Sequence, residues 1–176
     1  LRTSIDDAIN YDKKILVEHC IPNLVECNIS VLGNYRFQEA SVIEEVITSH
    51  SLLTYEDKYI GGSKKTGPSK GMASANRRIP AQIGDKLTKE ITNIGIEAFK
   101  ALGSSGCARI DFLVDSKDKT CYINEINSCP GSLAFYLWEP LKKPYQELLD
   151  DMIKIGVKDY QARLKKVHSF ESNILS

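Results

Sequence analysis

The stretch ARIDFLVDSKDKTCYINEINSCPG, residues 108–131, brings charged and amide side chains into what otherwise reads as a buried hairpin. Alternate residues of a strand share a face, so Arg109 lies beside Asp111 in the first strand and Glu125 beside Asn127 in the second. A turn centred in the sequence SKDKT pairs Asp111 with Glu125 and Arg109 with Asn127, with Cβ atoms about 4.5–5.5 Å apart. Two carboxylates would therefore face each other across the hairpin.

Two facing carboxylates repel, and a divalent cation removes the conflict. Magnesium prefers oxygen ligands and keeps several waters or phosphate oxygens, so Asp111, Glu125 and Asn127 suit one or two such ions. Arg109 adds a fixed fork of donors for phosphate oxygens. The turn NSCPG follows, and its Gly131 leaves backbone N–H groups open to an anion beside the proposed ligands.

Other interpretations of the same hairpin stay open. The two carboxylates could be solvated, or paired with Arg109, on an ordinary sheet face. Opposed carboxylates about 5 Å apart are also the arrangement of a retaining glycosidase, so a hydrolase is a second functional hypothesis. The strict alternation further predicts that Cys121 and Ile123 share the face of Glu125 and Asn127.

Composition limits the partners. The 176 residues carry 23 Lys plus Arg and 23 Asp plus Glu, so no net field recruits nucleic acid or an anionic membrane. No segment has the run of about 18 apolar residues that a membrane span needs. Five cysteines without CxxC spacing favour reduced thiols, and the expected location is the cytoplasm.

Apolar runs before the hairpin predict a helix and three strands. SIDDAINYD predicts a short helix over about 4–11, with Ser4 as the candidate N-cap. Runs rich in β-branched residues at 14–21, 26–34 and 39–47 predict consecutive antiparallel strands.

Helical periodicity and loop composition complete the pattern. Apolar residues at three- and four-residue steps predict helices over about 83–103 and 144–166. Strands interrupted by helices predict an α+β fold, an antiparallel sheet flanked by helices. Residues 55–82 are rich in Gly, Ser, Lys and Pro and predict a long loop, either a mobile lid over an anion or a solvated segment. The loop's basic residues are Lys58, Lys64, Lys65, Lys70, Arg77 and Arg78.

The motifs RIDFLVD and YINEINSCPGS resemble the C-terminal catalytic segment of ATP-grasp enzymes, most closely the D-alanine–D-alanine ligase family. ILVEHCI followed by ECNISVLGN resembles the family's adenine and ribose strands, and TYEDKY resembles its segment before the mobile loop. The resemblance covers roughly residues 1–140. It implies three parts: the end of the small ATP-grasp subdomain (1–54), a lid (55–82) and the catalytic subdomain (83–176).

The resemblance also implies an activity and its cofactors. The family phosphorylates a carboxylate with ATP and magnesium or manganese, and an amine attacks the acyl phosphate, releasing ADP and phosphate. The implied role is peptidoglycan precursor synthesis with D-alanine or another amino acid as substrate, in a homodimeric parent protein. Two metal ions are expected.

Individual roles follow from matching positions. The metal ligands would be Asp111, Glu125 and Asn127, and Arg109 with Gly131 would stabilise the tetrahedral intermediate. Lys58 would touch the transferred phosphate. The implied nucleotide contacts are Glu18, Cys20, Ile21, Glu26, Lys58 and Leu113. The implied substrate contacts are Tyr59, Ser132 and Tyr136.

Departures from the family pattern bear on the substrate. Tyr136 falls where D-alanyl ligases place a serine that holds the acceptor carboxylate. Within AFYLWEP only the Tyr136 hydroxyl and the Trp138 indole N–H can donate, which predicts a more aromatic acceptor pocket. The alternative is that these aromatic side chains only pack the short helix against the domain.

The family's N-terminal substrate domain and phosphate-gripping lysines have no counterpart in these residues. The chain is therefore interpreted as the C-terminal portion of a ligase, inactive when isolated. A non-catalytic ATP-grasp remnant is the alternative within the same fold.

Overall fold

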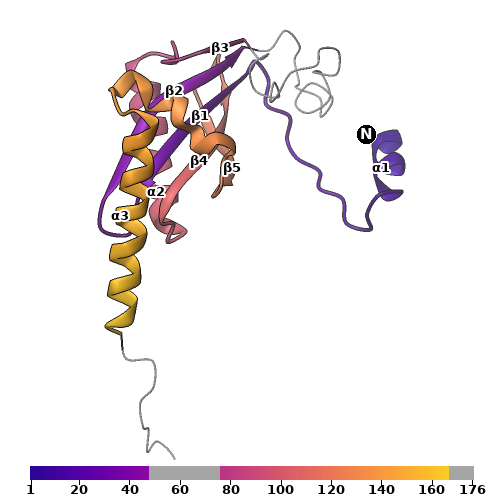
Figure 1. The fold of residues 1–176 in the computed structure, drawn as a ribbon. Helices are drawn as coiled ribbons and strands as arrows, with labels where there is room; N and C mark the ends of the chain where they lie inside the picture. Colours follow the sequence, from indigo (N-terminus) through magenta and orange to yellow (C-terminus); the bar gives the residue numbers. More distant parts are fainter. Residues whose placement is uncertain (48–75, 167–176) are drawn as a thin grey trace, which may run out of the picture.

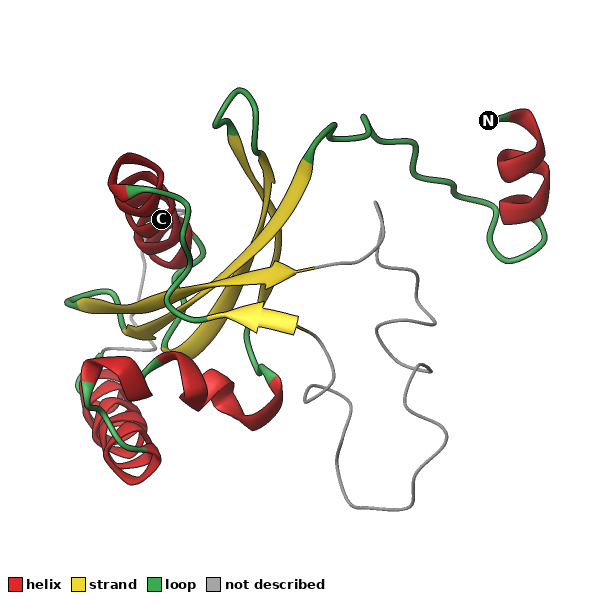
Figure 2. Cartoon of the chain, turned by 90° about the horizontal axis from the view of Figure 1, so that it is seen from above, coloured by secondary structure: helices red, strands yellow, loops and turns green. Residues whose placement is uncertain are grey.

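The computed structural model describes residues 1–47 and 76–166. It contains a five-stranded antiparallel sheet in the order β3-β2-β1-β4-β5, with helices on both faces (Figures 1 and 2). The strands are β1 Leu24–Gly33, β2 Gln38–Ile47, β3 Asn76–Arg78, β4 Gly106–Asp115 and β5 Cys121–Asn127. The helices are α1 Arg2–Ile9, α2 Asp85–Ala101 and α3 Tyr145–Leu164, with short 3-10 turns η2 Gly131–Leu137 and η3 Glu139–Leu141. The predicted α+β fold is confirmed.

One face of the sheet packs on α2. Alternate residues of the two central strands, such as Ile29 on β1 and Ile110 and Phe112 on β4, are at most 1% exposed and form one core with Leu87, Ile91 and Phe99 of α2. Gly95 allows the close approach of this helix, because a Cβ there would lie 3.1 Å from Ile29 Cγ2. The central strands thus present an apolar face to α2.

The opposite face is divided along the strands. Near the Gly33 end, Leu32 and Cys107 pack with Trp138, Leu148 and Ile155, so η2 and α3 cover this part. Figure 2 shows the sheet between α2 on one side and α3 with the short helices on the other. The polar residues of β1, β2, β4 and β5 occupy the rest of this face.

The predicted strand over 14–21 is wrong. Residues 12–23 contain neither helix nor strand, and they lead away from the sheet to α1, which buries none of its residues (Figure 1). A β-branched run becomes a strand only when another strand satisfies its backbone groups, and no described strand pairs with this run. Ser4 also lies inside α1 and is not its N-cap.

Other boundaries agree closely with the prediction. The strands expected over 26–34 and 39–47 pair as β1 and β2, and the two later helices begin and end within two residues of their expected positions. Most of the expected loop 55–82 lies outside the described residues. Its end differs from the prediction, because Asn76–Arg78 pairs with β2 as β3.

The hairpin of β4 and β5 contains a register irregularity between Asp111 and Phe112. Asp111 pairs with Glu125 and Phe112 pairs with Ile123, so β5 has one extra residue there. The expectation that Cys121 and Ile123 share the Glu125 face is therefore wrong. They pair with Val114 and Phe112 and share the apolar face.

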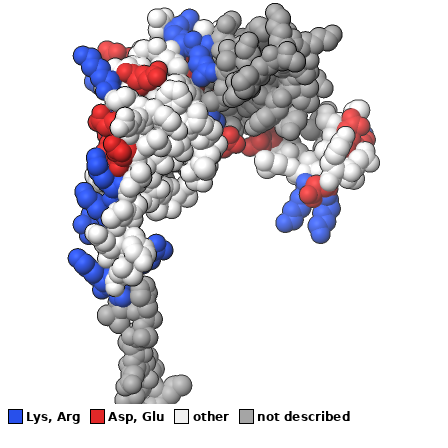
Figure 3. Space-filling view, in the orientation of Figure 1, with Lys and Arg blue, Asp and Glu red and all other residues white. Residues whose placement is uncertain are grey.

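The surface carries charged side chains of both signs, in line with the equal numbers of basic and acidic residues in the sequence. Figure 3 shows lysine, arginine, aspartate and glutamate side chains interspersed along α3. Within residues 1–47 and 76–166, none of the helices combines the length and apolarity needed to cross a bilayer.

Candidate active site

Four polar residues form one row across four strands. The strand registers pair Glu44 on β2 with Asn28 on β1, Asn28 with Asp111 on β4, and Asp111 with Glu125 on β5. Paired residues of neighbouring strands project to the same face. We call Glu44, Asn28, Asp111 and Glu125 the polar row. It lies on the face opposite α2.

Arg109 forms an ion pair with Asp111 of the polar row. Its Nε and Nη2 donate to the two carboxylate oxygens of Asp111 at 2.7 and 2.6 Å, and both side chains are about 15% exposed. The hydrogen bond to Asp111 raises the pKa of the Arg109 guanidinium, which outweighs the lowering by burial. Arg109 also pairs in register with Asn127, as the hairpin pattern predicted.

The oxygen atoms around Asp111 suit a hard cation. The Glu125 side chain is exposed and has no hydrogen bond or ion pair to another described residue. Asn127 Oδ1 accepts a hydrogen bond from the Cys129 N–H at 3.0 Å and keeps a second lone pair. The described residues contain no cluster of three His, Cys, Asp or Glu able to hold a metal ion. A cation here would complete its coordination shell with amide, water or phosphate oxygens, as Mg²⁺ usually does.

The turn after β5 has an unusual backbone. Gly131 is exposed, and a Cβ there would have no atom within 4 Å. Ser132, Leu133 and Ala134 follow with φ angles of 51°, 55° and 51°, in the left-handed region. Left-handed conformation costs a non-glycine residue about 1–2 kcal/mol. Other contacts must therefore hold this turn in place.

Tyr136 and Trp138 both donate within the domain. The Tyr136 hydroxyl donates to Glu44 Oε2 at 2.9 Å, and the Trp138 indole N–H donates to Ser30 Oγ at 3.1 Å. Trp138 is fully buried, so the packing alternative holds for this residue. Burial, followed by the charge of Glu44 and the hydrogen bond to it, raises the pKa of Tyr136 to about 12. Its role toward a substrate stays a prediction.

Of the predicted nucleotide contacts, the structure brings only two to the polar row. Glu26 and Leu113 pair in register one step from Asn28 and Asp111 on the same face. Glu18, Cys20 and Ile21 lie on the extended segment before β1, largely exposed, and are not brought to the row. Lys58 and Tyr59 fall outside the described residues.

Sequence reasoning missed Glu44 and Asn28, and it assigned Arg77 to the basic loop and not to a strand beside Glu44. Glu44 is 4% exposed, accepts from Asn28 Nδ2 at 3.1 Å and forms an ion pair with Arg77 at 3.3 Å. The Arg77 guanidinium also stacks on the Tyr136 ring, 4.9 Å from its centroid. The available signal was a glutamate inside the apolar run EASVIEEVI, and only the register of β1 and β2 gives it a place in the site.

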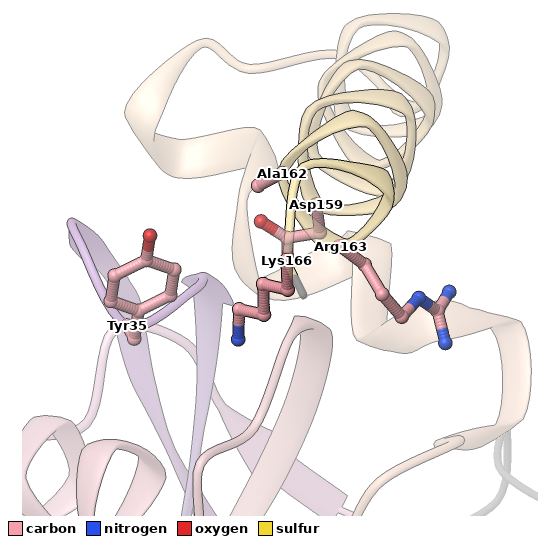
Figure 4. Close-up of a pocket in the computed structure, with 5 residues that line it drawn as sticks. All are labelled: Tyr35, Asp159, Ala162, Arg163 and Lys166. Carbon is pink, nitrogen blue, oxygen red and sulfur yellow. The ribbon is translucent and has the colours of Figure 1, made fainter. Parts of the chain in front are cut away.

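A hollow of about 260 Å³ lies elsewhere, near the C-terminal end of α3 (Figure 4). It is lined by Tyr35, Asp159, Ala162, Arg163 and Lys166. Tyr35 follows the Gly33 end of β1, well separated along the strand from Asn28. The hollow contains none of the polar row, so it is not the candidate site.

Comparison with known proteins identifies the family. The family described as D-ala D-ala ligase C-terminus matches residues 1–154. The chain belongs to this family. Relatives named D-alanine–D-alanine ligase include those of Thermosipho africanus, 34% identical over 99% of the chain and 44% of the relative, and Thermoanaerobacter sp. (strain X514), 36% identical over 90% and 42%.

Solved ligase structures share the fold. The D-alanine–D-alanine ligase of Coxiella burnetii superposes with a TM-score of 0.69 at 25% identity, over 93% of this chain and 40% of that one. The VanG D-Ala:D-Ser ligase of Enterococcus faecalis gives a TM-score of 0.67 at 23% identity, over 88% and 42%. The chain thus spans less than half the length of the relatives that it matches.

Proposed function

We propose that this chain supplies the ATP-binding and cation-binding part of an ADP-forming carboxylate–amine ligase. In this reaction ATP phosphorylates a carboxylate, and an amine attacks the acyl phosphate with release of ADP and phosphate. One observation carries the proposal: Asp111 and Glu125 are register partners, with Arg109 and Asn127 as the next pair on the same face.

The proposed ligands for one or two Mg²⁺ or Mn²⁺ ions are Asp111, Glu125 and Asn127. When bound, these ions would neutralise charge on the ATP phosphates. Arg109 would then direct its fork of N–H donors at the oxygens on which negative charge develops. The open backbone at Gly131 would add N–H donors beside them.

Nucleotide contacts form the second part of the proposal. Glu26, on the face of the polar row, would accept from the ribose hydroxyls, and Leu113 would contact the base or sugar beside it. Glu18, Cys20 and Ile21 would meet the adenine only if the segment before β1 lies against the sheet in the nucleotide complex. Lys58 and Tyr59 keep their proposed roles at the transferred phosphate and at the substrate.

The proposed substrates are D-alanine or another amino acid, in peptidoglycan precursor synthesis in the cytoplasm by a homodimeric protein. The acceptor is the open part of this proposal. Because the Tyr136 hydroxyl proton points to Glu44, a substrate carboxylate would need a different donor near Ser132 or Gly131. No nucleic acid or membrane takes part in the proposed reaction.

The test is ATP-dependent phosphate release by the full-length protein, assayed with a panel that includes D-alanine, D-serine, D-lactate and larger amino acids. We expect ADP and phosphate in amounts equal to the ligated product, with one acceptor preferred by kcat/KM. Binding of ATP without turnover on any acceptor would instead indicate a non-catalytic ATP-grasp protein. Formation of AMP and pyrophosphate would contradict the proposed chemistry.

A further inference from the structure

Glu44 is a buried carboxylate with three separate partners. It is 4% exposed and accepts hydrogen bonds from Asn28 Nδ2 at 3.1 Å and from the Tyr136 hydroxyl at 2.9 Å, both at Oε2. Its Oε1 lies 3.3 Å from Arg77 Nη1. These partners belong to β1, η2 and β3, so a single side chain on β2 joins three other elements.

The Arg77 guanidinium completes a compact group. It forms an ion pair with Glu44 and covers the face of the Tyr136 ring. Because Tyr136 also donates to Glu44, the three side chains all contact one another. A buried carboxylate is stable only when it is paired and hydrogen-bonded, and here a cation, a phenol and an amide meet that need. The group is therefore built around the charge of Glu44.

The backbone that this group holds is strained. Ser132, Leu133 and Ala134 are left-handed, and such a run persists only where its surroundings fix it. Three contacts do so: Tyr136 with Glu44, Trp138 with Ser30, and the Leu133 carbonyl, which accepts from Cys107 Sγ at 3.5 Å. Only the first of these involves a charged group, and hydrogen bonds to charged groups are the stronger kind.

We propose that Glu44 is a positioning residue that holds the left-handed turn 132–134 in place through Tyr136. The inference rests on the proposed function in one respect, namely that this turn contacts the acceptor substrate. Glu44 itself would touch neither nucleotide nor cation. Its effect reaches the reaction only through the placement of the turn.

The chain offers a matched control one residue away. Glu45 forms an ion pair with Arg78 at 2.9 Å, and both pair in register on the opposite face of the sheet. Glu44→Gln and Glu45→Gln therefore remove the same charge from neighbouring positions of β2. Only the first of these changes touches the group that includes Tyr136.

Hydrogen exchange on the 176-residue chain tests the placement without any activity. We expect amides of 131–138 to exchange about tenfold faster in Glu44→Gln, with α2 unchanged, because a tether to a charged group is lost. Glu45→Gln should exchange there like the wild type. If exchange is faster in every part of Glu44→Gln, the variant is destabilised as a whole, and Tyr136→Phe is the test to use. It removes the hydrogen bond from Tyr136 to Glu44 and leaves Glu44 paired with Arg77. Wild-type exchange at 131–138 in Tyr136→Phe would overturn the proposal.

Kinetics of the full-length protein test the positioning role. Glu44→Gln should raise the acceptor KM or lower kcat by about tenfold or more, since misplacement of a substrate contact by about 1 Å can cost about 100-fold in rate. The KM for ATP should stay within about twofold of the wild-type value. Glu44→Asp should restore part of the loss, and Tyr136→Phe combined with Glu44→Gln should be no worse than the poorer single variant. Unchanged acceptor kinetics in folded Glu44→Gln would overturn the positioning role of Glu44. An inactive wild type would refute the proposed function and leave the exchange result standing.

Discussion

Arg109 holds both carboxylate oxygens of Asp111, with its Nε 2.7 Å from Oδ1 and its Nη2 2.6 Å from Oδ2. The same oxygens are the proposed cation ligands, and Glu125, the register partner of Asp111, has no partner among the described side chains. The arginine therefore neutralises one carboxylate of the pair. A cation that binds Asp111 must compete with this ion pair.

Removal of the ion pair between Arg109 and Asp111 should increase the affinity of this site for a cation. Arg109→Gln leaves the oxygens of Asp111 free and removes a positive charge, so we expect Mn²⁺ alone to bind the 176-residue chain about three- to tenfold more tightly. Electron paramagnetic resonance of unbound Mn²⁺ measures this directly. Arg78→Gln, which breaks the ion pair with Glu45 on the other face, should not alter the affinity. Equal or weaker binding in Arg109→Gln would place the cation elsewhere.

Thiol reactivity tests the packing of the sheet. Cys20 and Cys129 are exposed, whereas Cys27 and Cys107 are buried. Burial, then the charge of Glu45, raises the pKa of Cys27 to about 12, and burial raises the pKa of Cys107. At pH 8 we expect the exposed thiols of Cys20 and Cys129 to react rapidly with a chromogenic disulfide. The buried thiols of Cys27 and Cys107 should react only when the protein unfolds. Rapid labelling of Cys27 by mass spectrometry would contradict the described core.

Tyr136 should contribute to a loss of stability at high pH. Its pKa is raised from 10.0 to about 12, so the folded protein favours the neutral phenol. This contribution is present below pH 10 and is lost as the pH rises from 10 to 12. After allowance for partial exposure we expect it to be about 1 kcal/mol.

The comparison is between slopes against pH. The free energy of unfolding of Tyr136→Phe should fall less between pH 9.5 and 11.5 than that of the wild type, by about the 1 kcal/mol above. Tyr11→Phe serves as the control, because Tyr11 is 91% exposed. Parallel slopes for all three proteins would show that the Tyr136 hydroxyl is not held by Glu44.

The hairpin was predictable because its determinants are local. Arg109 and Asp111 alternate in one strand, Glu125 and Asn127 alternate in the next, and the short turn between them fixes their opposition. The extra residue of β5 has no signature in composition, so the predicted face of Cys121 and Ile123 was wrong. A one-residue irregularity reverses every side chain beyond it.

Non-local pairing set the limit for the other elements. Residues 14–21 have the composition of a strand but no partner among the described strands, whereas Asn76–Arg78 lacks that composition and pairs with β2. Glu44 and Asn28 join the site only through the registers of β1 with β2 and β4. Neither register follows from the spacing of residues along one strand.

The most direct test of the proposed cation site is Glu125→Gln in the full-length protein. Because the Glu125 side chain is exposed and has no partner among the described residues, this change should leave the free energy of unfolding unaltered, whereas Asp111→Asn also breaks an ion pair. We predict that ATP-dependent phosphate release in Mg²⁺ falls at least about 100-fold in Glu125→Gln, since a cation ligand is lost, and that Glu45→Gln keeps wild-type activity. Wild-type turnover by folded Glu125→Gln, or by the wild type in excess chelator, would contradict a cation held between Asp111 and Glu125.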